Sequence, residues 1–316
     1  MGTRRVGRAA AALVLSLTAG ACGHEPAVQP TAPAPVTPAT SPPAPSYVTY
    51  PVGLRVLHLR RGPHRPLTTL VFYPAARFAT AGPGIGRLGA LSPARGSATE
   101  PADGRFPLVL FSHGLSGSPE RYAAALSGWA AAGFVVAAPT YPFTSQYAAH
   151  VRRADIVHQP ADARYVLDQV RLLDATPGDA LAGRIDVDHV AAVGHSAGGY
   201  TTAGLFTAGH DARLRAGVIM AGWLAPGAFA GPPATMLFLQ GTSDPVVPRA
   251  ISRKAFDRVP WPKRYLLLRH NSHATYLRPG DIGYALVEST VLDFLRWTLN
   301  GDNAARRRLP RGAVVD

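Results

Sequence analysis

Three side chains, far apart in the sequence, have the types and settings that serine-based acyl transfer needs, and the most specific setting is that of Ser196. The heptapeptide from Val193 to Gly199 reads VGHSAGG and contains the pattern G-x-S-x-G. This pattern is typical of a strained turn between a strand and a helix, which lifts a serine hydroxyl above a sheet. A glycine-rich turn with an idle serine also fits these residues, so the partners and neighbouring elements must decide.

A serine hydroxyl is a weak nucleophile at neutral pH and needs a base, which a third group orients. The candidate acid is Asp244 in FLQGTSDPVVP, although an aspartate before proline is also common in ordinary turns. The stretch LLLRHNSHATY offers two bases, His270 and His273. We favour His273 because it lies in the loop beyond the expected strand end. Asp281 is discounted because the expected order is serine, acid, histidine.

Acyl transfer also needs backbone N–H groups that stabilise the negative oxygen of the tetrahedral intermediate, each worth about 3 kcal/mol of barrier. We predict that Ala197, directly after the serine, supplies one of them. Leu115, in the turn after the apolar run FPLVLFSHG, supplies the other. His113 and Gly114 shape this turn, and a role for His113 as the catalytic base is the alternative.

Apolar segments that alternate with helical segments predict an α/β fold with a mainly parallel sheet covered on both faces. Residues 48–60 and 67–73 predict an antiparallel pair at the sheet edge, and residues 79–104 a long surface loop. The remaining expected strands are 106–114, 133–139, 189–195, 216–222, 234–241 and 264–270, and the expected helices are 118–132 with Ser118 as cap, 162–173, 199–208, 249–258 and 282–299. Functional groups gather beyond the carboxyl ends of such strands, where all three candidates lie.

The first 46 residues have the composition of export and spacer segments. Residues 1–21 combine arginines with a short apolar run, which is typical of a signal peptide and weakly resembles a twin-arginine signal. Cys22, the only cysteine, follows Ala-Gly-Ala, so we expect it to be lipidated; plain secretion is the alternative. Residues 22–46 are rich in proline and alanine and predict a semi-rigid linker. We assign residues 47–300 to the folded domain and residues 301–316 to a basic tail.

The composition is that of a globular protein, and its charge pattern argues against nucleic acid as a partner. The chain has 316 residues, of which 47% are hydrophobic and 16% charged, with a formal net charge of +13. The arginines form no stripe with interleaved aromatics, so we expect no nucleic acid; the charge is solvated surface or gives loose attraction to anionic lipid or wall polymer. No set of ligands has metal spacing, and we expect no metal, no other cofactor and a monomer.

The segments PLVLFSHGLSGSPERYAAALSGWAAAGFVVAAPTYP, GRIDVDHVAAVGHSAGGY, LQGTSDPVVP and NSHATY together resemble the α/β-hydrolase superfamily. The likeness covers about residues 48–300 and is to the branch of dienelactone-hydrolase-like proteins, platelet-activating-factor acetylhydrolases and bacterial polyester hydrolases of cutinase type. It implies Ser196 as nucleophile, His273 as general base and acid, and Asp244 as the group that orients it. It also implies Leu115 and Ala197 as oxyanion donors.

The same resemblance places Trp223, in the segment MAGWLAP, where polyester hydrolases of this kind keep a tryptophan that faces the substrate; core packing fits equally well. We assign further substrate contacts to His113, Gly114 and His195. Dienelactone hydrolases use a cysteine nucleophile, so the serine argues against that activity. The stretch 224–235 is too short for a large lid.

These observations predict an exported serine ester hydrolase, attached to the membrane through Cys22, that cleaves a small or polymeric carboxylic ester through an acyl-enzyme. An envelope acyltransferase, a serine peptidase of the same fold and an inactive lipidated binding module remain as alternatives.

Overall fold

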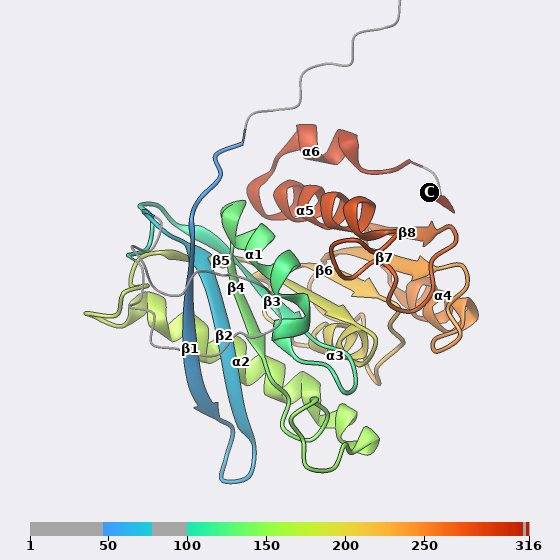
Figure 1. Cartoon of the computed structure of the whole chain (residues 1–316), viewed down its shortest axis with the longest axis horizontal. Coiled ribbons are helices and arrows are strands. Elements are labelled where there is room, and N and C mark those ends of the chain that lie inside the picture. Colours follow the sequence, from blue (N-terminus) through green and yellow to red (C-terminus); the bar gives the residue numbers. More distant parts are fainter. Residues whose placement is uncertain (1–46, 78–99, 312–313, 316) are drawn as a thin grey trace, which may run out of the picture. The chain divides into compact units, whose positions relative to one another are not determined.

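The computed structural model describes residues 47–77, 100–311 and 314–315, which are built around a nine-stranded sheet (Figure 1). The strand order is β1-β2-β4-β3-β5-β6-β7-β8-β9. β1 and β2 are antiparallel to each other, β2 is antiparallel to β4, and all further neighbours are parallel. The strands are β1 (Val52–Arg60), β2 (Pro66–Pro74), β3 (Phe106–Ser112), β4 (Val135–Pro139), β5 (Ile185–His195), β6 (Leu214–Met220), β7 (Thr235–Gly241), β8 (Lys263–Leu268) and β9 (Val314–Val315).

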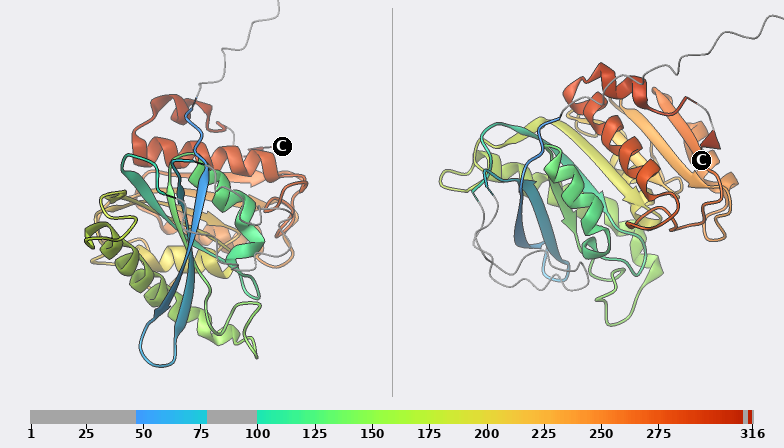
Figure 2. Two further views of the ribbon diagram at one scale, coloured as in Figure 1. Left: turned by 60° about the vertical axis from the view of Figure 1, so that its left-hand side comes forward. Right: turned by 45° about the horizontal axis from the view of Figure 1, so that its top comes forward.

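Helices cover both faces of the sheet, as Figures 1 and 2 show. α1 and α5 pack against one face and α2, α3 and α4 against the other, and each face has its own cluster of buried apolar side chains. The helices are α1 (Ala123–Ala131), α2 (Gln159–Ala175), α3 (Ala197–Leu205), α4 (Arg249–Arg258), α5 (Tyr284–Asn300) and α6 (Asn303–Arg308), with short 3₁₀ helices at Pro119–Tyr122 and Arg153–His158.

β3 and β4 are buried along their whole length because the sheet is covered on both faces at these strands. In β3, Leu108 and Leu110 belong to the cluster on one face, whereas Val109 and Phe111 belong to the cluster on the other. A strand covered on both sides lacks the polar alternation of a half-exposed strand. The predicted fold class, with its antiparallel pair at the edge, is therefore confirmed.

The expected helix 118–132 differs from the observed one at its start. Pro119 opens a 3₁₀ turn that ends at Tyr122, and α1 follows from Ala123. The predicted cap is wrong, because the Ser118 side chain makes no capping hydrogen bond. Its hydroxyl instead accepts a hydrogen bond from Gln146 Nε2 at 2.9 Å. Most of the loop predicted at 79–104 lies outside the described residues.

The residues after 300, predicted as a basic tail, contribute α6 and β9 to the domain. Gly301 ends α5 in a left-handed conformation, with φ of 72°, and Asp302 then caps α6 by accepting from two amides of its first turn. β9 pairs in parallel with β8. The folded domain therefore extends past the predicted boundary. The predicted signal peptide, Cys22 and the linker lie outside the described residues. Within the part that the structure describes, no helix is both long enough and apolar enough to cross a membrane.

Candidate active site

Ser196 occupies a strained turn between β5 and α3. Its φ of 57° and ψ of −118° place a non-glycine residue in a region that L-residues rarely adopt. Such a conformation costs about 1–3 kcal/mol and persists only where the surroundings impose it. The backbone N–H of Ser196 donates to Met220 O at 2.8 Å, which ties the turn to the end of β6. The predicted nucleophile elbow is thus present as a backbone geometry.

The glycines of the motif allow backbone segments to approach one another more closely than any side chain permits. A Cβ on Gly198 would lie 1.9 Å from Ser112 O, and one on Gly194 would lie 2.1 Å from Gly198 O. A Cβ on Gly199 would lie 2.8 Å from Gly222 Cα. These neighbours are backbone atoms, which cannot rotate away as a flexible side chain can. The small residues around Ser196 are therefore required by packing of α3 onto β3, β5 and the end of β6.

Asp244 and His273 are joined by a hydrogen bond between their side chains. His273 Nδ1 donates to Asp244 Oδ2 at 2.8 Å, and the Asp244 side chain has no exposed surface. The backbone N–H groups of Val246 and Val247 donate to Asp244 Oδ1 at 2.8 and 2.9 Å. Burial raises the pKa of Asp244, but the hydrogen bonds from His273, Val247 and Val246 outweigh it, so this pKa lies below its usual value. The carboxylate is therefore ionised and holds the imidazole by its Nδ1–H.

The loop that carries His273 is attached to the elbow through His195, the residue before the candidate nucleophile. His195 Nε2 donates to the backbone carbonyl of His273 at 2.8 Å, and the two rings lie 4.7 Å apart between centroids. The Ser196 hydroxyl itself makes no hydrogen bond with any residue that the structure describes. Hydrogen bonds between nucleophile and base are often long in unliganded sites and shorten with substrate. The structure thus brings His273 to the elbow without a closed hydrogen bond.

His195 is neutral and uses both ring nitrogens within the protein. A carbonyl can only accept, so Nε2 carries the proton, and Nδ1 accepts from the Tyr122 hydroxyl at 3.1 Å. Burial, with a smaller effect of the nearby His273, lowers the pKa of His195 to about 3. No ring nitrogen is left for a ligand, which contradicts the substrate contact predicted for this side chain. His195 instead positions the loop of His273.

His113 is also a buried, neutral ring that links two backbone segments. Tyr141 N donates to its Nε2 at 3.1 Å, so Nδ1 carries the proton and donates to Gly114 O at 2.8 Å. Burial lowers the pKa of His113 to about 4. With both nitrogens engaged and no exposed surface, the ring can neither contact substrate nor act as the base. The predicted substrate contact and the alternative base role of His113 are therefore both wrong. Its hydrogen bonds agree with the prediction that His113 shapes the turn after β3.

The turn after β3 lies directly against the elbow. A Cβ on Gly114 would come within 3.2 Å of Ser196 Cβ, and Ser116 N donates to Thr144 O at 2.7 Å, which fixes the turn from its other side. Within the described residues, the backbone N–H groups of Leu115 and Ala197 donate to no other group. Two unpaired N–H groups on either side of a nucleophile are what an oxyanion site requires.

Trp223 lies half-buried at the end of β6. Its ring packs on Tyr200 of α3, with 5.6 Å between ring centroids, and contacts the apolar cluster on that face. The remaining exposed part of the indole leaves both predicted roles, core packing and substrate contact, in place. The competing base candidate His270 does not contact Asp244. It is exposed, with a φ of 58°, and its backbone N–H donates to Thr242 Oγ1, whereas its ring makes no hydrogen bond with the described residues.

Two side chains that support the site were not predicted from the sequence. Gln240 Nε2 donates to Asp244 Oδ2 at 2.9 Å and to Val247 O at 3.0 Å, so it fixes the loop of the acid. Tyr122 supports His195, as described above. Gln240 is a polar residue that follows the apolar run MLFL of β7, which is a signal that could have singled it out. Tyr122 gives no such signal, because a tyrosine near a helix start is unremarkable in sequence.

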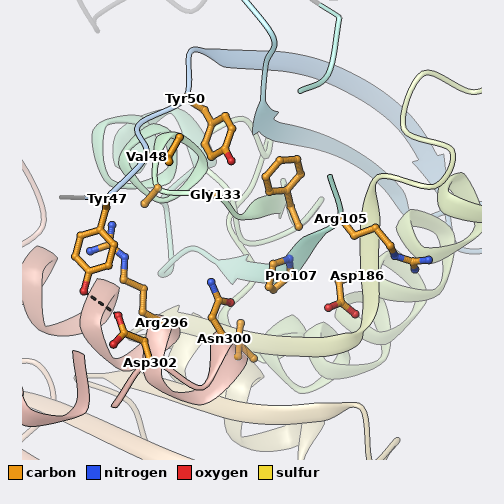
Figure 3. Close-up of a pocket in the computed structure, with 13 residues that line it drawn as sticks. Tyr47, Val48, Tyr50, Arg105, Pro107, Gly133, Asp186, Arg296, Asn300 and Asp302 are labelled. Atoms are coloured by element: carbon orange, nitrogen blue, oxygen red, sulfur yellow. Dashed lines mark hydrogen bonds between the residues drawn. The ribbon is translucent and has the colours of Figure 1, made fainter. Parts of the chain in front are cut away.

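A pocket of about 430 Å³ lies away from these residues, at the amino ends of β3 and β5 (Figure 3). Its lining includes Arg105, Pro107 and Asp186, and Tyr47, whose hydroxyl donates to Asp302 at 2.8 Å. None of the predicted site residues lines this pocket. Among the residues that the structure describes, no group of three or more histidine, cysteine, aspartate or glutamate side chains is placed to hold a metal ion.

Comparison with known proteins gives relatives that agree with this geometry. Residues 89–172 match the family "Platelet-activating factor acetylhydrolase, isoform II". The chain is 28% identical to the platelet-activating factor acetylhydrolase of Canis lupus familiaris over 42% of this chain, and this match spans 40% of that relative's length. A solved structure of a ferulic acid esterase from Streptomyces cinnamoneus superimposes with a TM-score of 0.64, at 21% identity, over 86% of this chain and 96% of that one.

The structural likeness extends over nearly the whole of both chains, although few residues are identical, so it establishes the fold. The sequence match falls on the segment that contains β3, α1, β4 and most of α2, and it ends before β5 and the elbow. The chain has the α/β-hydrolase fold, and its segment 89–172 is similar to the platelet-activating factor acetylhydrolase, isoform II, family.

Proposed function

We propose that this protein is a serine ester hydrolase that cleaves carboxylic esters through an acyl-enzyme intermediate. The observation that carries the proposal is the strained Ser196 turn with the Asp244–His273 hydrogen bond held next to it. The strain at Ser196 is what we expect of a nucleophile that packing holds in position. The ionised Asp244 is what we expect beside a base, because the base must be neutral and correctly oriented. The relatives bear the names acetylhydrolase and esterase, which favours esters as the substrate class.

In the proposed first step, His273 Nε2 removes the Ser196 proton while the serine oxygen attacks the ester carbonyl carbon. Asp244 keeps the proton of His273 on Nδ1 and stabilises the cation that forms. The carbonyl oxygen becomes negative and accepts hydrogen bonds from the N–H groups of Leu115 and Ala197. The intermediate then collapses: His273 gives the proton to the leaving alcohol, and the acyl group stays on the serine.

In the second step, water replaces the alcohol. His273 removes a proton from the water as it attacks the acyl carbon, and the same two N–H groups hold the oxygen. Collapse of this intermediate returns the proton to the serine and releases the carboxylic acid. His273 thus carries a proton in both steps, from the serine to the leaving alcohol and then from water to the serine, and the same two N–H groups hold the oxygen each time.

Labelling with a fluorophosphonate tests the nucleophile, and hydrolysis of a series of p-nitrophenyl esters tests the reaction. We expect labelling and hydrolysis to vanish in Ser196→Ala, with a loss in kcat of about 10⁶ by analogy with other serine hydrolases. Ser289→Ala, which removes an exposed hydroxyl on α5, is the matched control and should leave both unchanged. Labelling that survives Ser196→Ala would contradict the proposal.

The same panel separates the alternatives. A peptidase would cleave amide substrates faster than esters of the same acyl group, and an acyltransferase would pass the acyl group to an added alcohol faster than to water. An inactive binding module would not react with the fluorophosphonate at all. Ester chain length, varied across the panel, would also test whether extended polymeric substrates of the kind that cutinases cleave are accepted.

We further propose that the protein is exported and attached to the membrane by a lipid on Cys22, and that it acts as a monomer. The apolar run in residues 1–21 and the Ala-Gly-Ala that precedes Cys22 support the export and the lipid attachment. Incorporation of a fatty-acid analogue into the wild-type chain, and its loss in Cys22→Ser, is the expected result. Equal incorporation in both chains, or none in either, would contradict it.

A further inference from the structure

A second pocket, of about 410 Å³, lies where α6 meets β8, and its lining carries positive charge only. Four of its six lining residues are arginines and none is acidic: Arg264, Asn303, Arg306, Arg307, Leu309 and Arg311. The pocket in Figure 3 is different, because two arginines there are balanced by two aspartates. The α6 pocket is therefore the one with an unbalanced charge.

Neighbouring acids do not neutralise these arginines. In the part of the chain that the structure describes, the side chains of Arg307 and Arg311 have no hydrogen-bond acceptor and no carboxylate partner. Arg308, one residue further along α6, shows the contrasting arrangement, since its Nε donates to Asp293 Oδ2 at 2.9 Å. Arg308 is thus used within the fold, whereas its neighbours around the pocket are left available.

The other two arginines are held in place by contacts that leave donors free. Arg264 Nη1 donates to the carbonyls of Leu309 and Pro310, at 3.3 and 2.5 Å, which fixes its side chain across the pocket. The Arg306 guanidinium lies over the Trp297 ring, 5.0 Å from the centroid. Stacking on an aromatic face orients a guanidinium without using its N–H groups. Two of the four arginines are therefore pre-positioned.

We propose that this pocket binds the phosphate of an anionic phospholipid headgroup. The planar fork of a guanidinium matches two phosphate oxygens at once, and four such forks around one concave site favour a phosphate over a single-point anion such as chloride. The volume is within the range of pockets that hold small molecules, about 300–1,000 Å³, so it has room for the group esterified to the phosphate. The pocket is separate from the ester-cleaving site, because it shares no residue with it.

A lipid is favoured over a nucleic acid by the arrangement of the charges. Nucleic-acid sites repeat basic residues along a stripe or helix that follows successive phosphates, with aromatics for stacking. Here the free arginines surround one pocket whose lining contains no aromatic residue, and the Trp297 ring is covered by Arg306. The chain also enters the domain beside α6, because Tyr47, the first described residue, bonds Asp302 at the α6 cap. With Cys22 lipidated as proposed, residues 22–46 connect the lipid to Tyr47; the charge argument does not depend on that lipid.

Vesicle binding of the full chain, carrying Cys22→Ser so that no lipid anchor contributes, tests the proposal. We expect it to sediment with vesicles of phosphatidylglycerol in phosphatidylcholine, not with phosphatidylcholine alone, and to be released by salt. Arg307→Ala/Arg311→Ala should weaken the partition coefficient about 25-fold, at about fivefold per arginine. The matched control is Arg153→Ala/Arg164→Ala, which removes two exposed, unpaired arginines near and on α2, on the other face of the sheet, and should weaken it less than twofold.

Three further measurements test whether the variants fold, whether the site recognises a phosphate and whether the phosphate belongs to a lipid. Hydrolysis of a soluble p-nitrophenyl ester should be the same in all of these chains, which shows that they are folded. Arg307→Lys/Arg311→Lys keeps the charge but loses the fork, and partial binding by this variant supports a phosphate-shaped site. An equal loss in the control pair overturns the proposal, since it would indicate attraction by net charge alone. Binding of glycerol phosphate without vesicle binding, or equally tight binding of duplex DNA through the same arginines, also overturns the lipid assignment.

Discussion

Ser196 and His273 belong to one candidate site, but different forces hold them in place. At Ser196 the backbone is confined by other backbone, because Gly198 and Gly194 leave no space for even a Cβ. At His273 the confinement comes from hydrogen bonds, from its own Nδ1 to Asp244 and from His195 to its carbonyl. The proposed nucleophile is therefore fixed by close packing, and the proposed base is fixed by polar contacts.

This difference teaches where each half of the site is vulnerable. Close packing does not depend on pH and fails only when atoms are added, since an interior packed to crystal density cannot accept more volume. Hydrogen bonds fail when an atom loses its charge, its proton or its partner, with little change in volume. Substitutions and pH changes that act on one half and spare the other can therefore test the comparison.

The largest expected effect is on the polar half, in Asp244→Asn. The amide keeps the size of the carboxylate but removes its charge, and it favours the wrong tautomer of His273. We expect kcat/KM for a p-nitrophenyl ester to fall about 10⁴-fold, with a small change in thermal stability. Asp281→Asn is the matched control, because Asp281 caps the same loop through the backbone of Leu277 and Arg278 and does not touch the imidazole. A loss in the control as large as in Asp244→Asn would contradict the assigned role.

The next effect is on the packed half, in Gly198→Ala. The added Cβ would lie 1.9 Å from Ser112 O, so α3 must move away from β3. We expect a loss of about 1–3 kcal/mol in the free energy of unfolding and about 10² in kcat/KM, because the nucleophile is displaced. In Gly178→Ala the new methyl group meets nothing within 4 Å, although its φ is +80°. That control should cost about 1 kcal/mol in stability and no activity. Full activity in Gly198→Ala would show that the elbow is not fixed by shape.

A third effect is a pH dependence of stability, which arises in the polar half from the buried rings of His113 and His195. The pKa values of His113 and His195 fall from about 6.5 in the unfolded chain to about 4 and about 3 in the fold. Between these limits the unfolded chain binds more protons, so stability present above pH 6.5 is lost as the pH falls. At about pH 5.5 each ring has lost roughly 1.4 kcal/mol, or about 3 kcal/mol for the pair.

Urea unfolding measures this loss when it is repeated at several pH values between 8 and 5.5, a range chosen from the pKa values above. His195→Gln should remove about half of the dependence, because the glutamine does not titrate. The window also excludes Asp244: its lowered pKa means that its contribution is complete above its usual value of 3.8 and is lost only at lower pH. A stability that is flat across the window would show that the two rings are not buried as neutral groups.

How much of the site could be predicted from the sequence follows the same division. The packed half was predictable from the sequence. A position that has no room for a side chain can be filled only by glycine, and glycines stand on both sides of Ser196. The order of the three side chains and the strand ends before them then led to Asp244 and His273, and the apolar runs between them led to the sheet. Local patterns thus identified the fold class and led to the three side chains of the candidate site.

The supporting polar contacts were not predictable, because they join residues with no shared local pattern. Nothing near Tyr122 in the sequence indicates that its hydroxyl meets a ring at position 195. His113 and His195 looked like residues for substrate because they stand beside reacting positions, but burial and paired nitrogens make them internal braces. The tail was misjudged for a related reason, since arginines suggest solvent, whereas Arg308 pairs with Asp293 and Asp302 caps α6.

The smallest expected effect tests whether His195 braces the base loop. His195→Ala removes the donor to the His273 carbonyl and leaves that carbonyl and the Tyr122 hydroxyl unpaired, which costs about 1–3 kcal/mol of stability. We expect kcat to fall about 30-fold, within the range for misplaced catalytic groups, and KM to change little, because the imidazole is displaced while the substrate surface remains. Steady-state kinetics on a p-nitrophenyl ester measure both constants.

His195→Gln distinguishes a brace from a merely stable core. Its amide N–H can reach toward the His273 carbonyl and restore the donor, so most of the kcat should return, although the longer side chain packs less well. Tyr122→Phe removes only the outer bond to the ring and should lose less than His195→Ala. If Gln and Ala variants lose kcat equally, or if KM rises with kcat unchanged, His195 acts on substrate binding, and the polar half of the site is held by Asp244 alone.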